Sequence, residues 1–167
     1  MTAYKNVSCP SCGAPGEVDR FAAMATCPYC GGAYYFLDEA VLAMGQMAIL
    51  ADDPTSILVG DRGRVGEESF IVMGRLRYRY DAGVWDEWFC RCDDGDELWI
   101  SEDEGNLMLE SWREEDSPPV DYASVRPGSE IAIGETVFHV DEKDVAECEG
   151  GEGQLPFPLV MGEKVPF

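Results

Sequence analysis

Positive charge and histidine are both scarce in this sequence. Its 167 residues include 12 Lys and Arg, 33 Asp and Glu and one His, which gives a formal net charge of −21. A surface that acidic repels phosphate backbones and anionic membranes, so we expect neither nucleic-acid binding nor direct membrane insertion. It can attract a basic partner, although a plain solvated surface explains the same composition.

Familiar catalytic motifs are also missing. The chain has no Gly-x-Ser-x-Gly elbow and no phosphate-cradling loop, because the glycines at residues 60–63 precede no expected helix. The one histidine, His139, lies on an expected strand, where a structural role is commoner than a general base. Paired carboxylates identify no site in so acidic a chain. We therefore expect a protein that binds and does not catalyse.

No apolar run is long enough to cross a bilayer. The longest apolar-leaning stretch, residues 40–51, is interrupted by Gly45 and Gln46, whereas a membrane helix needs about 20 apolar residues. The sequence shows no basic region followed by an apolar run, so we expect no secretory signal. Seven cysteines, an odd number, fit a reducing compartment better than a disulfide framework. We expect a cytoplasmic protein.

Two Cys-x-x-Cys pairs lie 14 residues apart near the start of the chain. They consist of Cys9, Cys12, Cys27 and Cys30. Two cysteines on a tight turn can direct both sulfurs at one ion, and two such turns complete a tetrahedron. Glycine follows each pair, at Gly13 and Gly31, and permits the left-handed backbone that such a turn needs. The pattern predicts a zinc ribbon with one structural Zn²⁺. A redox dithiol pair and a rubredoxin-type iron site are the alternatives.

We expect the ribbon to span residues 1–37, with residues 17–18 and 24–26 as the arms of a short hairpin. Residues 1–36 carry no net charge, which separates this ribbon from the usual nucleic-acid binders. Because the ribbon is small and has little core, metal binding must supply on the order of 10 kcal/mol of its folding free energy. Replacing Cys9 and Cys12 should then unfold the ribbon and leave the rest folded. A small core or a docking surface is expected from Tyr29, Tyr34, Tyr35 and Phe36.

Residues 57–167 have the pattern of an antiparallel β-meander. Short runs of β-branched and aromatic residues alternate with Gly- and Asp-rich turns at intervals of about ten residues. We expect strands at 70–80, 85–92, 98–100, 106–112, 130–133, 136–140 and 145–147, with an irregular edge strand in 151–167. Residues 38–56 are expected to be a connector, extended rather than helical because Gly45 weakens a helix. The fold class is mainly β: a small zinc ribbon plus an antiparallel barrel-like or sandwich domain.

Three arginines alternate with apolar residues on the strand at 70–80. They are Arg75, Arg77 and Arg79, which share one face of the strand. A three-residue hairpin loop at 81–83 would place Arg77 opposite Glu87. We interpret the arginine face as cross-strand ion pairing rather than as a grip for an anion. Outside the ribbon, Cys90, Cys92 and Cys148 are interpreted as small buried side chains.

Several features of the body recur in a known bacterial family. They are a Gly-rich turn before Phe70, Gly74-Arg75, Trp85 with Glu87-Trp88, Asp94-Gly95, Trp99, the turn at 102–105, and residues 153–156, where Gln154 replaces an acid. On these features the chain resembles the domain-of-unknown-function family 4178, whose domain often follows a four-cysteine zinc ribbon. The resemblance implies no established activity. Association of the family with small membrane proteins, polyamine-synthase-like proteins and envelope-stress components implies an accessory role near a membrane system.

Three functions remain open on the sequence. The closed metal site and the missing catalytic set favour a non-catalytic interaction or scaffold module with a protein partner. An enzyme of unrecognised type would have to use acidic residues of the β domain. An acidic nucleic-acid mimic would bind a basic protein through its negative surface.

Overall fold

The computed structural model describes residues 4–38, 40–50, 55–110 and 120–167, and every regular element in those ranges is a β-strand. The first five strands are β1 (Tyr4–Ser8), β2 (Pro15–Asp19), β3 (Met24–Thr26), β4 (Gly32–Leu37) and β5 (Ala40–Gln46). The next five are β6 (Arg62–Val65), β7 (Glu68–Tyr80), β8 (Gly83–Cys92), β9 (Glu97–Asp103) and β10 (Asn106–Glu110). The last four are β11 (Glu130–Ile133), β12 (Thr136–His139), β13 (Val145–Leu155) and β14 (Lys164–Pro166). The predicted mainly β fold class is confirmed.

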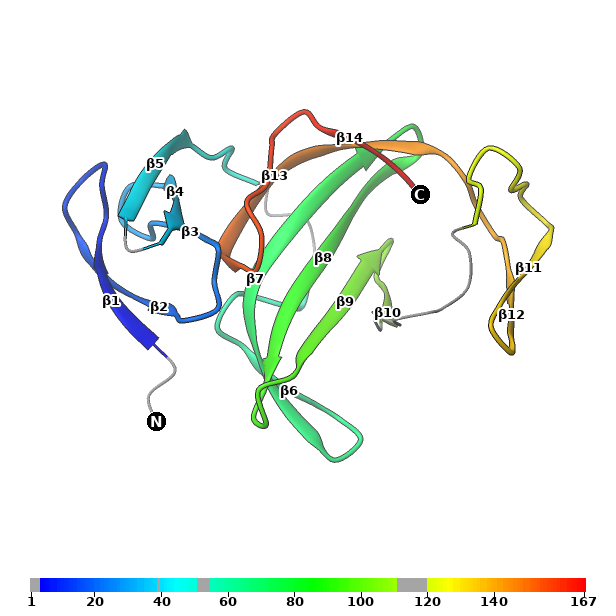
Figure 1. Cartoon of the computed structure of the whole chain (residues 1–167), viewed down its shortest axis with the longest axis horizontal. Helices are drawn as coiled ribbons and strands as arrows, with labels where there is room; N and C mark the ends of the chain where they lie inside the picture. Colours follow the sequence, from blue (N-terminus) through cyan, green and yellow to red (C-terminus); the bar gives the residue numbers. More distant parts are fainter. Residues whose placement is uncertain (1–3, 39, 51–54, 111–119) are drawn as a thin grey trace.

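One antiparallel sheet runs through most of the molecule. Its strands follow the order β10-β9-β8-β7-β13-β3-β4-β5, with β6 beside the start of β7 and β14 beside the start of β13. Two short hairpins, β1–β2 and β11–β12, lie at opposite ends of the molecule (Figure 1). Because β13 pairs with β7 along its middle and with β3 at its C-terminal end, it joins the ribbon to the rest of the sheet.

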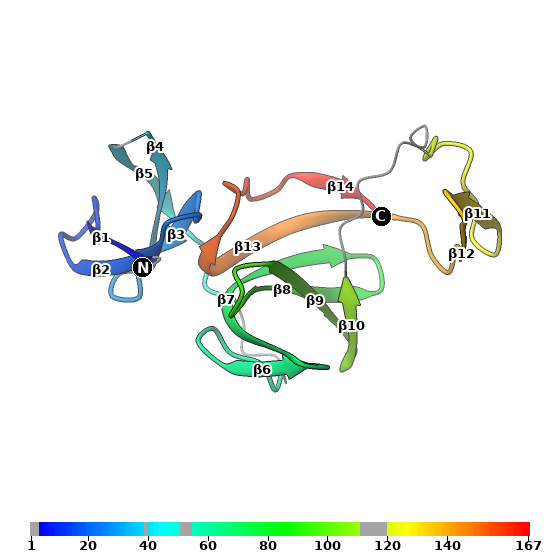
Figure 2. The same cartoon turned by 60° about the horizontal axis from the view of Figure 1, so that its bottom comes forward.

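The two faces of the sheet have different contents. Side chains alternate along β7, so Leu76 lies on one face while Arg75 and Arg77 lie on the other. The face of Leu76 carries the larger apolar cluster. Its buried members are Met24, Ala33, Met47, Met73, Leu76, Phe89, Trp99, Cys148, Leu155 and Leu159. Figure 2 shows that β7 to β10 curve. The face of Arg75 and Arg77 holds a second cluster that includes Trp88 and Cys90.

The β7–β8 hairpin differs by one residue from its predicted register. Tyr80 pairs with Gly83, so the loop has two residues and Gly83 already belongs to β8. Arg77 therefore stands opposite Asp86, and the predicted pairing with Glu87 is wrong. Since side chains alternate along a strand, the shift brings Asp86 onto the arginine face and moves Glu87 to the other face. The shorter loop makes Asp86, and not Glu87, the acid opposite the buried guanidinium of Arg77.

Strand pairing inside the ribbon also differs from the prediction. β2 pairs with β1 and β3 pairs with β4, so residues 17–18 and 24–26 are not the arms of one hairpin. The reason is the distant partner of β3, since Met24 pairs with Leu155 of β13. β13 is accordingly much longer than the strand expected at 145–147. Residues 151–155 lie inside the sheet, and β14 is the C-terminal edge strand.

The other strand predictions agree with the structure to within one or two residues at most ends. Residues 111–112 of the strand expected at 106–112 lie outside the described residues. Within the expected connector, β5 confirms extended structure over a helix. Gly45 adopts a φ of 107° there, which few residues other than glycine tolerate.

Candidate metal centre

The two cysteine pairs lie on turns with matching hydrogen bonds. In the first turn the N–H of Gly13 donates to the carbonyl of Cys9 at 2.8 Å. In the second turn the N–H of Gly31 donates to the carbonyl of Cys27 at 2.9 Å. The two glycines have φ values of 75° and 69°, so each closes its turn in the left-handed region. The sequence prediction of two equivalent glycine-closed turns is confirmed.

These turns bring the four sulfurs into one cluster. The Sγ atoms of Cys9, Cys12, Cys27 and Cys30 all lie within 4.8 Å of one another. Two of the separations, Cys9 to Cys30 and Cys12 to Cys27, are 3.8 Å. A tetrahedral site with metal–sulfur bonds of about 2.3 Å has sulfur–sulfur edges of about 3.8 Å. The cluster therefore fits one tetrahedrally bound metal ion.

The protonation of the cluster points to the same need for a cation. The backbone N–H of Cys12 is the main cause that lowers the pKa of Cys9 to about 6. At Cys30 the backbone N–H of Gly32 acts to lower the pKa, but the other three thiols and burial together raise it to about 12. Four thiols this close do not all ionise unless a bound cation compensates their charge. The donor set is thus chemically suited to a metal.

The ribbon is joined to β13 by hydrogen bonds and by apolar packing. The N–H of Ala23 donates to the carbonyl of Leu155 at 2.9 Å, and the N–H of Asp19 donates to Gln154 Oε1 at 2.6 Å. Met24 is fully buried against Leu155 in the larger apolar cluster. The ribbon therefore contributes a side chain to the core of the β domain. Sequence reasoning missed this junction, and no local signal reveals it because its partners lie about 130 residues apart.

The arginine face carries a buried ion-pair network. Asp86 accepts hydrogen bonds from Arg75 at 2.6 Å and from the Nε and Nη2 atoms of Arg77 at 2.8 and 2.7 Å. Arg75 also lies 3.4 Å from the carboxylate of Glu152, and Arg79 pairs with Glu149. The predicted cross-strand ion pairing is confirmed. Two arginines that share one carboxylate hold β7 and β8 in register at a site where both guanidinium groups are buried.

A comparison with protein-family models assigns the body of the chain. The model of the family "Domain of unknown function (DUF4178)" matches residues 58–167. The chain belongs to the DUF4178 family. No curated protein and no solved structure matched it. The DUF4178 region contains β6 to β14, and the four ribbon cysteines precede it.

Other residues singled out in the sequence are placed as follows in the DUF4178 protein. His139 is exposed on β12, 3.9 Å from Asp141. Cys90 is fully buried, and burial raises its pKa to about 12, which confirms its interpretation as a small core side chain. In the ribbon, Tyr34 is buried in a small core while Tyr29 is 72% exposed.

The remaining observations concern a second group of potential metal ligands and membrane-spanning helices. Glu68, Cys92 and Asp94 form a second group of potential ligand atoms within 4.8 Å of one another, but two of the three residues are exposed acids. Within the described ranges, no helix has the length and apolarity that crossing a membrane requires.

Proposed function

We propose that this DUF4178 protein is a non-catalytic accessory protein that acts as a protein–protein interaction or scaffold module. The observation that carries the proposal is the cluster of four cysteines joined to the family's sheet through β3 and β13. A metal held by four protein ligands has no open position for a substrate, so its role is to shape the ribbon. The family's link to membrane and envelope-stress components suggests where a partner should be sought.

We propose that the metal is zinc, bound once per chain by Cys9, Cys12, Cys27 and Cys30. Zinc is the common occupant of closed four-thiolate sites, whereas iron in the same geometry gives a coloured, redox-active centre. Elemental analysis of the purified protein should find about one zinc per chain and no visible absorbance. A red protein with stoichiometric iron would overturn the zinc assignment.

The interaction role is tested by affinity capture from a native extract. The zinc-loaded chain should retain specific partners that a matched control, a Val137→Asp variant of the exposed β12 strand, also retains. The same experiment with Cys9→Ser and Cys27→Ser should lose them, because the ribbon surface is no longer formed. Turnover of a small molecule by the purified chain, with no partner captured, would instead favour the enzyme. Capture of DNA-binding proteins alone would favour the acidic mimic.

A further inference from the structure

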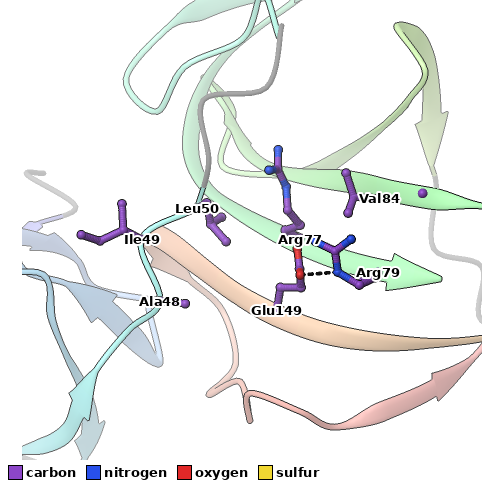
Figure 3. Close-up of a pocket in the computed structure, with 8 residues that line it drawn as sticks. Ala48, Ile49, Leu50, Arg77, Arg79, Val84 and Glu149 are labelled. Carbon is purple, nitrogen blue, oxygen red and sulfur yellow. Dashed lines mark hydrogen bonds and ion pairs between the residues drawn. The ribbon is translucent and has the colours of Figure 1, made fainter. Parts of the chain in front are cut away.

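A hollow of about 590 Å³ lies between the ribbon and the DUF4178 sheet. Its ribbon wall includes Val18 and Thr26, and its sheet wall includes Met73 and the glycines of β13. The third wall is the segment at residues 47–50, which leads from β5 toward the β domain. A neighbouring hollow of about 480 Å³ is also lined by residues 48–50 of this segment (Figure 3). We call the larger hollow the junction groove.

Two exposed apolar side chains line the junction groove. Ile49 is 98% exposed and Val59 is 40% exposed, and both line the groove. In Figure 3 Ile49 lies on the ribbon side of its backbone segment, and Leu50 lies on the side of Arg77. A fully exposed isoleucine beside a hollow gains free energy when a partner covers it. The groove therefore suits an occupant with apolar side chains.

The charge of the groove restricts the occupant further. Two charged side chains, Glu17 and Glu152, are found among its described lining residues, and both are acidic. Glu17 is exposed, while Glu152 lies 3.4 Å from Arg75 and is less available. The net charge of −21 adds a long-range field that draws cationic groups toward the molecule. A basic side chain on the occupant is attracted to Glu17 and Glu152, and an acidic side chain is repelled.

Two glycines of β13 line the groove on the side of the sheet. A Cβ at Gly153 would lie 2.3 Å from the carbonyl of Met73, and a Cβ at Gly151 would lie 2.8 Å from that of Arg75. Both positions must therefore be glycine, and Leu159 and Val59 pack beside them. Thr26 Oγ1 is buried and makes no hydrogen bond within the described part of the chain. An extended segment that enters the groove can hydrogen-bond this hydroxyl through its main chain, as extended peptides do when they bind proteins.

We propose that the junction groove binds an extended segment of a partner protein in which Lys or Arg is flanked by apolar residues. This inference rests on the proposed interaction role and names its surface and the class of its partner. It also assigns the ribbon a purpose, because the metal centre holds one wall of the groove in place. Binding should then require the metal.

The test uses the full zinc-loaded chain and a displayed library of random short peptides. Enriched peptides are synthesised and their affinities measured by fluorescence anisotropy. The groove variants are Ile49→Asp and Glu17→Lys. Their controls, Val137→Asp and Glu130→Lys, make the same changes at exposed positions of the β11–β12 hairpin.

Enriched peptides should carry Lys or Arg between apolar residues and bind both controls with unchanged affinity. Each groove variant should bind the enriched peptides with an affinity at least about tenfold lower than that of the native chain. Peptides without basic residues, or peptides that bind Ile49→Asp as well as the native chain, would overturn the groove inference and leave the interaction role standing. Failure to enrich any sequence would also reject the groove, while capture of partners from extract decides the interaction role separately.

Discussion

Removal of the metal should destabilise the whole molecule and not the ribbon alone. The sequence predicts that a ribbon without its cysteines unfolds by itself, because the cysteines and their turns lie within one short segment. The structure predicts otherwise, since Met24 of the ribbon is fully buried in the main apolar cluster and pairs with Leu155. If the ribbon unfolds, one side of that cluster is exposed to water.

The size of the destabilisation follows from the groups that are exposed to water when the ribbon unfolds. Exposing Met24 costs about 1.5–3 kcal/mol. The hydrogen bond from Ala23 to Leu155 is lost, at a net cost of about 1 kcal/mol. Partial exposure of Leu155 and Leu159 brings the loss to about 4 kcal/mol, out of a typical stability of about 5–15 kcal/mol. For a domain near 100 residues this lowers the Tm by roughly 15 °C or more.

Calorimetry with and without a strong zinc chelator measures this shift directly. Near-UV circular dichroism reports on the same core, because Trp99 packs against Phe89 with ring centroids 5.1 Å apart. Met24→Ala, in the metal-loaded protein, is the matched control: it should cost about 2–5 kcal/mol and leave the zinc content unchanged. Two separate transitions, of which the larger keeps its Tm after chelation, would refute the coupling of ribbon and sheet.

Four substitutions, one of them a control, test the rest of the sheet, each by urea denaturation. Asp86→Ala removes the carboxylate that two buried arginines share and should lower the free energy of unfolding by about 3–5 kcal/mol; an unchanged midpoint would contradict this. Gly74→Ala should cost about 1–3 kcal/mol, because its Cβ would lie 2.4 Å from a backbone oxygen of β13. Gly83→Ala, whose nearest heavy atom is 4.0 Å away, is the control and should be nearly neutral. Burial raises the pKa of Glu87 in the folded state, so stability falls as pH rises above the ordinary value of 4.5; Glu87→Gln should stabilise at pH 7 and lose that advantage below pH 4.5.

Local chemistry made the metal cluster predictable from the sequence. The spacing of the cysteine pairs and the glycine after each pair specify two turns that need no distant partner. The strands of the meander were predictable for the same reason, since alternating side chains and turn residues act within a few positions. The arginine face and its use in ion pairs also followed from alternation along one strand.

Two features could not be predicted because they depend on distant contacts. The register of the β7–β8 hairpin depends on whether Gly83 ends the loop or begins the strand, and the local sequence permits both. Either loop places an acid opposite Arg77, Glu87 in the longer loop and Asp86 in the shorter one, so the ion pair does not reveal the register. The junction of Met24 with Leu155 is less visible still, because three residues of β3 carry too short a pattern to indicate any partner.

The glycines of β13 connect these separate results. Gly153 pairs with Gly74, and a Cβ on either residue would lie under 2.5 Å from a backbone oxygen of the opposite strand. The two strands can cross so closely only without side chains, and β13 then continues to pair with β3 of the ribbon. Gly153 also lines the junction groove. A single structural requirement thus joins the ribbon to the sheet beside the groove, so loss of the metal should abolish the groove and destabilise the core together.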